Sequence, residues 1–219
     1  MGAYKSSGYI LPFMTNSDWD KSVKISQRLL ERMRGPNYNP NMRGISLYFA
    51  FVCDAEGVKL FEINNRPGDP EIINLLPLMK NDFVDVCDSM LEGALTYINF
   101  RQLASVGFYV VPKPYPDVDG KIREVDTTSF DAIAASYNGR LLGYPGGVER
   151  SGETSYATQS RTFYSLGIGH KKEMARTAAL DGAYGINGDF RIRGDVASPE
   201  HIQRSVEHMK RLRNRRIKA

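Results

Sequence analysis

The sequence has very little cysteine and no long apolar run. Its 219 residues include only two cysteines, Cys53 and Cys87. Both lie within apolar patterns, which is typical of buried thiols in a reducing cytoplasm rather than of a disulfide. No apolar stretch approaches the roughly 20 residues that span a bilayer, and residues 1–5 lack the basic and then apolar pattern of a signal peptide. The sequence therefore predicts a cytoplasmic protein with no membrane partner.

Signatures of several common site types are missing as well. The stretch Gly167–Lys171 holds only a lone glycine pair at a strand-to-helix turn, which is more often structural than a Walker-type phosphate loop. The sequence shows no serine or cysteine triad. The three histidines, His170, His201 and His208, lack the spacing of metal ligands and are expected at the surface or at helix ends.

Basic residues outnumber acidic ones, and many of them gather near the C-terminus. The net charge is +4, and residues 210–219 form a dense run of lysine and arginine. Such a tail can bind nucleic acid, but no aromatic residues are interleaved with it. We favour a solvated helix end, whose cations suit the negative end of the helix dipole. A nucleic-acid partner is therefore not expected.

Composition and periodicity predict an α+β fold. With 42% hydrophobic and 25% charged residues, the chain resembles an ordinary globular protein with a real core. Alternating apolar residues predict strands at 44–53 and 58–63, joined by a hairpin turn at 54–57.

The remaining elements are predicted from helical or alternating periodicity. A first helix over 17–34 has Ser17 as its expected cap and Asp20 three residues on. The other expected helices lie at 70–79, from about 82 into the 90s, at 171–184 and from 198 onward, and the other expected strands lie at 105–111, 139–142, 161–168 and 189–196.

The most informative segment is Phe61–Glu71, at the end of the returning strand. Glu62 and Asn64 are two residues apart, so on a strand their side chains point to the same face. Magnesium prefers hard oxygen ligands, with few from protein and the rest from phosphates and water. Arg66 follows two residues later and can hold phosphate oxygens in a fork. The spacing alone also fits a solvated strand end beside a turn.

The residues that follow suit the start of a helix. Asp69 is a favourable N-cap, Pro70 fits the first helical position and Glu71 fits the first turn.

These residues resemble a motif of glycinamide ribonucleotide synthetase, the phosphoribosylamine–glycine ligase family of the ATP-grasp superfamily. The family has a segment of the form Glu-Phe-Asn-x-Arg-Phe-Gly-Asp-Pro-Glu, which residues 62–71 match except for Ile63 and Pro67 in place of its two phenylalanines. Pro67 fixes φ and removes a backbone donor. The start of the chain, Met1–Tyr4, is similar to the end of the family's Gly-Gly-Met-Gly-Ala-Tyr motif. The stretches 80–93, 104–117, 161–170 and 193–196 are also similar to family segments, whereas the match over 112–160 is loose.

The resemblance implies a reaction and a set of site residues. ATP phosphorylates the carboxylate of glycine, and the amine of phosphoribosylamine then attacks the acyl phosphate. Glu62 and Asn64 are implied as ligands of Mg²⁺ or Mn²⁺ that bridges the phosphates of ATP. Arg66 is implied as the catalytic residue that steadies the transferring phosphoryl group and, with Gly68, as part of the nucleotide site.

The resemblance also implies two domains and a missing half. Residues 1–103 are expected to form an ATP-grasp C-terminal lobe, an antiparallel sheet with helices, and residues 104–219 a small α/β C-terminal domain. The family's N-terminal half has no counterpart here, which fits a natural split subunit, a fragment or a truncated gene product. We expect a partner chain that supplies the missing half and no activity without it. The alternatives are an ATP-grasp ligase for other substrates and a non-catalytic module, which Pro67 favours.

Overall fold

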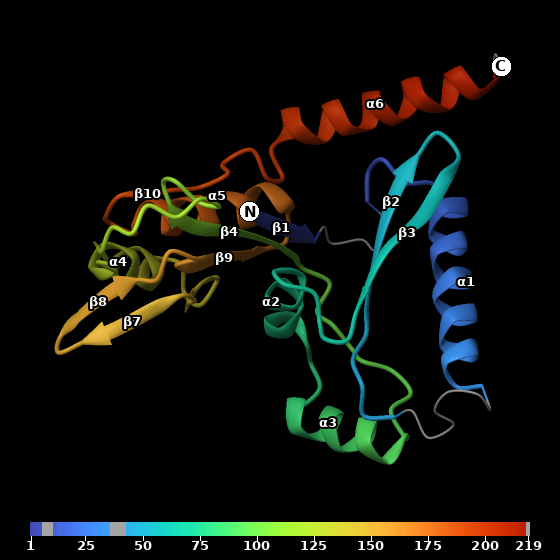
Figure 1. The fold of residues 1–219 in the computed structure, drawn as a ribbon, viewed down its shortest axis with the longest axis horizontal. Coiled ribbons are helices and arrows are strands. Elements are labelled where there is room, and N and C mark those ends of the chain that lie inside the picture. Colours follow the sequence, from blue (N-terminus) through green and yellow to red (C-terminus); the bar gives the residue numbers. More distant parts are fainter. Residues whose placement is uncertain (6–10, 36–42, 218–219) are drawn as a thin grey trace. The chain divides into compact units, whose positions relative to one another are not determined.

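The computed structural model describes residues 1–5, 11–35 and 43–217, which divide into two compact units (Figure 1). The sheet unit comprises Met1–Tyr9, Ile73–Leu75 and Gln102–His201. The hairpin unit comprises Ile10–Ile72, Leu76–Arg101 and Ile202–Ala219. These units differ from the contiguous ranges 1–103 and 104–219, because the first strand of the chain pairs within the later sheet. The assignment of residues 1–103 and 104–219 to two domains of the family stays a prediction.

The sheet unit is built on a five-stranded antiparallel sheet. Its order is β1 (Gly2–Lys5), β4 (Ala104–Pro112), β9 (Phe163–Gly169) and β6 (Leu141–Pro145), and β10 (Phe190–Arg191) also pairs with β4. A separate three-stranded sheet has the order β5 (Arg123–Glu124), β8 (Thr154–Ala157) and β7 (Val148–Ser151). Every residue of β4 is buried, as expected for a central strand.

Both faces of the five-stranded sheet are covered. On one face, alternate residues of β4 pack with residues of α4 (Thr128–Ser136) and with the alanines of α5 (Lys172–Tyr184). A Cβ at Gly167 would lie 2.0 Å from the carbonyl oxygen of Ala175, so α5 rests directly on β9. The other face carries a smaller cluster around Tyr109 and Tyr164, whose ring centroids are 4.6 Å apart.

A buried amide joins three strands of this sheet. Asn74, in α2 (Glu71–Leu75), is only 2% exposed. Its Nδ2 donates to the carbonyl oxygens of Ala3 at 3.1 Å and of Ser105 at 3.4 Å. Its Oδ1 accepts a 2.6 Å bond from the hydroxyl of Tyr164. Because buried polar groups are costly unless paired, this network anchors α2 to β1, β4 and β9.

The hairpin unit contains an antiparallel hairpin of β2 (Tyr48–Asp54) and β3 (Gly57–Asn64), as predicted. The helix α1 (Asn16–Met33) runs beside it (Figure 1). The unit also holds the short 3₁₀ helix η1 (Leu76–Leu78), α3 (Phe83–Glu92) and most of α6 (Pro199–Ile217). As expected, α3 begins just after Asp82, whose side chain caps it, and ends at Gly93 in the left-handed conformation.

The start of α1 differs from the prediction. Thr15 caps the helix, and a capping box joins it to Asp18, so Ser17 and Asp20 are not the caps. The three-residue spacing of the capping box was predicted correctly, but the box begins two residues earlier in the sequence than predicted. Asp18 is buried, and its carboxylate lies 2.5 Å from the guanidinium of Arg213 on α6. Burial opposes ionisation, but the bonds from Thr15 and the charge of Arg213 outweigh it and lower the pKa of Asp18.

Besides β1, four short elements were not predicted, and two of the predicted elements are markedly shorter. The strands β5, β7 and β8 and the helix α4 lie in the region rich in proline, glycine and aspartate, where sequence periodicity is weak. The expected strand at 189–196 is reduced to Phe190–Arg191, and the expected helix at 70–79 is reduced to α2 followed by η1.

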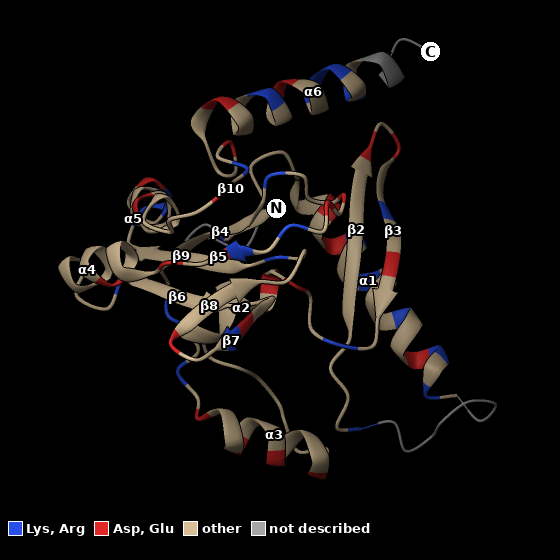
Figure 2. Ribbon diagram, turned by 60° about the vertical axis from the view of Figure 1, so that its left-hand side comes forward, with Lys and Arg blue, Asp and Glu red and all other residues tan. Residues whose placement is uncertain are grey.

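The described part of the C-terminal basic run, residues 210–217, lies on α6, where acidic residues alternate with basic ones toward the start of the helix (Figure 2). The ion pair of Arg213 with Asp18 gives one of its cations a structural role. Within the described ranges, no helix is both long and apolar enough to cross a membrane.

We predict that Asn74→Ala destabilises the protein by roughly 2–4 kcal/mol, because it removes three hydrogen bonds of a buried side chain, two to carbonyl oxygens and one from the hydroxyl of Tyr164. Urea unfolding followed by circular dichroism measures the change. The control is Asn65→Ala at an exposed position, which should change the free energy of unfolding by less than about 0.5 kcal/mol. Equal effects of the two substitutions would contradict the anchoring role.

Candidate functional site

The candidate site is formed by the open end of the β2–β3 hairpin and the turn that follows it. Ala50 pairs with Glu62, whereas Phe51 pairs with Leu60, so Phe61 is an extra residue in β3. Such a bulge changes the direction in which the following side chains point. Beyond it, Glu62 and Asn64 share one face, as predicted, and Asn64 Nδ2 donates a 2.9 Å hydrogen bond to Glu62 Oε1.

The donor set of this pair fits a hard divalent cation. The hydrogen bond uses an amide hydrogen of Asn64, so its Oδ1 keeps its lone pairs, and Glu62 has a second carboxylate oxygen. Two protein oxygens are a usual contribution to a magnesium site whose other ligands are phosphates and water. In the described part of the chain, no group of three or more His, Cys, Asp or Glu side chains is arranged to hold a metal. Metal binding at Glu62 and Asn64 stays a prediction.

Tyr48 is a member of the site that the sequence interpretation missed. It pairs with Asn64 across the hairpin, so both side chains share a face. Its hydroxyl donates a 3.1 Å hydrogen bond to Glu71 Oε1. A Cβ at Gly68 would lie 2.8 Å from the Tyr48 ring and 2.8 Å from Glu71 Oε2. Gly68 is therefore required structurally, because only a residue without a side chain lets the backbone pass so close to the ring.

Several charged groups surround Tyr48. The pKa of Tyr48 is raised to about 12 by burial, then by the charge of Glu71 and its hydrogen bond, and then by the charge of Glu62, whereas the charge of Arg66 opposes this shift. The phenol is thus held protonated as a donor to Glu71. The expected phosphate-binding residue, Arg66, is exposed, and its Nη1 donates to the carbonyl oxygen of Pro67 at 2.9 Å.

Asp69 does not cap the helix as predicted. The helix α2 begins at Glu71, Pro70 occupies the N-cap position, and no side chain makes a cap hydrogen bond. Instead, the amide of Ile72 donates to the carbonyl oxygen of Gly68 at 2.9 Å. The backbone turn over Gly68 therefore satisfies a donor that the Asp69 carboxylate was expected to satisfy.

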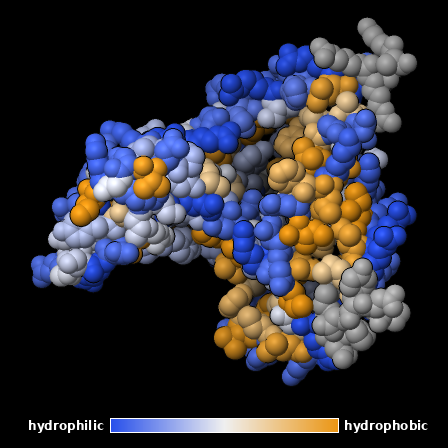
Figure 3. Space-filling model, in the orientation of Figure 1, coloured by the Kyte–Doolittle hydropathy of each residue, from blue (hydrophilic) through white to orange (hydrophobic). Residues whose placement is uncertain are grey.

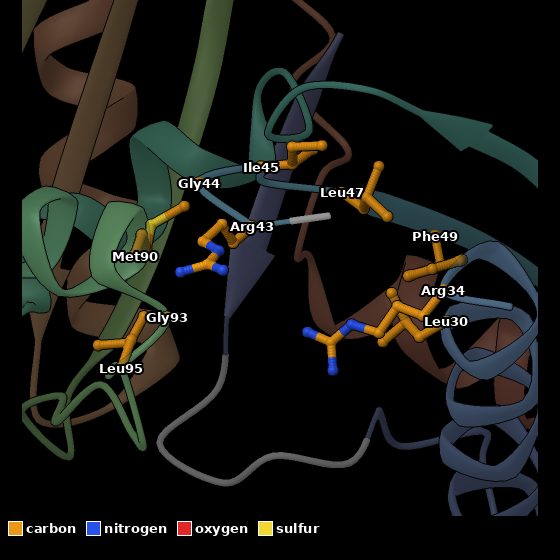
Figure 4. A pocket seen from close by; sticks show the side chains of 10 residues that line it. All are labelled: Leu30, Arg34, Arg43, Gly44, Ile45, Leu47, Phe49, Met90, Gly93 and Leu95. Carbon is orange, nitrogen blue, oxygen red and sulfur yellow. The ribbon is translucent and has the colours of Figure 1, made fainter. Parts of the chain in front are cut away.

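A hollow of about 310 Å³ lies elsewhere in the hairpin unit (Figure 4). Phe49 of β2 lines it, together with Leu47 just before this strand. Phe49 alternates along β2 with Tyr48, so it lies on the other face of the hairpin from the candidate metal ligands. Arg34 and Arg43 lie at its rim (Figure 4). Apolar residues also gather at the surface of this unit (Figure 3). Phe61, which belongs to the same unit, is 74% exposed.

Tyr48→Phe removes the donor to Glu71, so we predict a loss of about 1 kcal/mol of stability at neutral pH. The folded pKa of about 12 exceeds the ordinary value of 10.0, so the folded state binds more protons between these values. The contribution of the hydroxyl is therefore complete below pH 10 and decreases as the pH rises toward 12. Urea unfolding of both proteins from pH 8 to 12 measures this difference. Tyr97→Phe, at a 70% exposed position, serves as the control, and a difference that grew above pH 10 would contradict the prediction.

The chain is similar to curated proteins over nearly its whole length, although no protein-family model matches it. It is 33% identical over 218 residues to the phosphoribosylamine–glycine ligase of Methanocella arvoryzae, covering 97% of this chain and 47% of the relative. It is 34% identical to the enzyme of that name from Methanococcoides burtonii and 35% identical to that from Methanococcus maripaludis, with the same coverage. The chain thus spans about half the length of the curated relatives it matches.

A solved structure shares the fold. The crystal structure of phosphoribosylamine–glycine ligase from Thermotoga maritima matches 69% of this chain and 36% of its own, with a TM-score of 0.58 and 23% identity. This match supports the α+β class and the antiparallel sheets described above. Together with the identity to curated relatives, it shows that the chain belongs to the phosphoribosylamine–glycine ligase family, whose C-terminal half it matches.

Proposed function

We propose that the chain is the C-terminal part of an ATP-dependent carbon–nitrogen ligase that joins glycine to phosphoribosylamine in purine biosynthesis. The observation that supports this most directly is the convergence of Glu62 and Asn64 on one face, in a chain whose relatives are named for that reaction. The proposed cellular location is the cytoplasm, where ATP is available as the co-substrate.

The site residues act by binding and orienting charge. Glu62 and Asn64 would hold Mg²⁺ or Mn²⁺, which would neutralise charge on the phosphates of ATP. Arg66 turns from its contact with Pro67 toward the transferring phosphoryl group, whose charge it stabilises. Gly68 serves the nucleotide site by letting the backbone pass beneath Tyr48, which positions Arg66. Tyr48 and Glu71 hold this turn against the hairpin.

The reaction needs no nucleophile from the protein. The carboxylate of glycine attacks the terminal phosphorus of ATP and forms an acyl phosphate with release of ADP. The amine of phosphoribosylamine then attacks the acyl carbon, forms the amide and expels phosphate. Because the chain matches about half of each relative, a chain equivalent to their N-terminal half is the proposed partner, which completes the nucleotide site.

The metal assignment predicts that Glu62→Gln weakens Mn²⁺ binding in the presence of ATP by roughly tenfold or more. Loss of a residue that only supports a metal ligand already weakens metal binding by about this factor, and loss of a ligand itself should weaken it at least as much. Manganese-induced broadening of NMR signals from residues 62–66 of the isolated chain measures the binding. Glu56→Gln is the matched control, because Glu56 lies in the turn of the same hairpin and pairs with Lys59. Unchanged broadening in Glu62→Gln, or equal loss in both variants, rules out the assignment.

The partner assignment predicts that the isolated chain releases no phosphate from ATP with glycine and phosphoribosylamine. Addition of the N-terminal half of the Methanocella arvoryzae relative should restore release that depends on all three substrates. Arg66→Lys in the mixture should lower kcat, since lysine cannot form the planar fork of arginine. Robust turnover by the isolated chain contradicts the need for a partner, and a mixture that stays inactive despite forming a complex favours a non-catalytic module.

A further inference from the structure

The hollow of about 310 Å³ in the hairpin unit has largely apolar walls (Figure 4). Leu30 of α1, Phe49 of β2 and Met90 of α3 line it, so three separate elements contribute to its walls. Each of these three side chains is only half-buried. A ligand with an apolar body would remove this surface from water, which is favourable in proportion to the area covered. The volume lies at the lower end of the range of about 300–1,000 Å³ for small-molecule sites.

A backbone contact holds two of these walls together. The amide of Gly44, in the segment before β2, donates to the carbonyl oxygen of Met90 at 3.0 Å. Gly44 has a φ of +69°, and a Cβ at this position would lie 2.9 Å from a methyl carbon of Leu91. The segment before β2 therefore passes directly against the end of α3, which brings the adjacent Arg43 to the rim of the hollow.

The rim of the hollow carries positive charge. Arg34 is the C-cap residue of α1, and Arg43 lies on the segment before β2. Both side chains are exposed, and neither has a hydrogen-bond or ion-pair partner within residues 1–5, 11–35 and 43–217. None of the described residues that line the hollow is acidic. The two guanidinium groups are thus available to an anion, for which their planar forks are suited.

We propose that this hollow binds a small amphipathic anion, with its carboxylate or phosphate on Arg34 and Arg43 and its apolar body against the walls. A small molecule fits better than a polypeptide segment, because the space is limited and lies between three elements. The site is separate from the proposed ligase site, because Phe49 lies on the other face of the hairpin from Glu62 and Asn64.

Octanoate, octyl phosphate, octanol and octylammonium are the probes, since they share one apolar body and differ in charge. Each is titrated into the full chain without ATP or metal, and the methyl NMR signals of Leu30 and Met90 report binding. Both anions should give saturable shifts, octanol should bind at least tenfold more weakly, and octylammonium should not bind measurably. Added salt should weaken the binding of the anions. Octanol that bound as tightly as octanoate, or no saturable shift with either anion, would overturn the proposal.

The two arginines are tested separately. Arg34→Gln and Arg43→Gln should each weaken octanoate binding by about tenfold, the loss expected for one charge-assisted hydrogen bond. Arg32→Gln is the matched control, because Arg32 is exposed in the last turn of the same helix as Arg34 and does not line the hollow.

The control also separates binding from an effect on the helix end, where any cation suits the dipole. Thermal unfolding of the variants accompanies the titrations. Weaker binding in Arg34→Gln, with an unfolding midpoint equal to that of Arg32→Gln, supports a direct contact with the ligand. Equal loss of affinity in Arg32→Gln contradicts it.

The apolar wall is tested at its most accessible position. Ile45 lines the hollow and is 42% exposed, so Ile45→Ser should fold while weakening octanoate binding several-fold. Ile98→Ser, at a 37% exposed position of the same unit that does not line the hollow, is the control. Equal affinity of the two variants would place the apolar body of the ligand elsewhere and overturn the proposal.

Competition distinguishes the other occupants of this space. Octanoate binding should persist with saturating ATP and Mg²⁺, and with the N-terminal half of the Methanocella arvoryzae relative. Displacement by ATP would make the hollow part of a nucleotide site, and displacement by the added half would make it a polypeptide interface; either result overturns the proposal. Manganese broadening at Glu62 tests the ligase site independently, so the failure of one proposal leaves the other measurable.

Discussion

The side-chain amide of Asn74 is the contact on which most of the sheet unit depends. It is only 2% exposed, so each of its hydrogen-bonding groups must find a partner within the protein. The partners come from β1, β4 and β9, which are far apart in sequence. The helix that carries Asn74 begins at Glu71, the acceptor of the Tyr48 hydroxyl.

The bulge at Phe61 has a comparable role in the hairpin. Register in a β-hairpin decides which side chains share a face, and a slip of one residue reverses them all. Before the bulge, Leu60 pairs with Phe51. After it, Glu62 and Asn64 lie on the same face as Tyr48 because of the extra residue. The two proposed metal ligands therefore lie beside the tyrosine and glycine that hold the following turn, rather than among the apolar residues on the other face.

The charged groups of the hairpin site match one need of the proposed ligase. Glu62, Asn64 and Arg66 suit a metal-bound nucleotide, which brings negative charge and needs oxygen ligands for its cation. These residues are brought together within the hairpin unit by strand pairing, so the proposed site can be tested by binding alone.

The sequence by itself determined the features that depend on near neighbours. The alternating residues and the turn at 54–57 predicted the hairpin, the two-residue spacing placed Glu62 and Asn64 on one face, and Asp82 marked the start of α3. Only the tertiary structure decided that Tyr48 bonds Glu71, 23 residues away, that Tyr164 bonds Asn74, 90 residues away, and that Arg213 pairs with Asp18, 195 residues away. Local periodicity indicates which face of an element a side chain occupies. It does not indicate which distant segment packs against that face, and this packing determines the partners of these side chains.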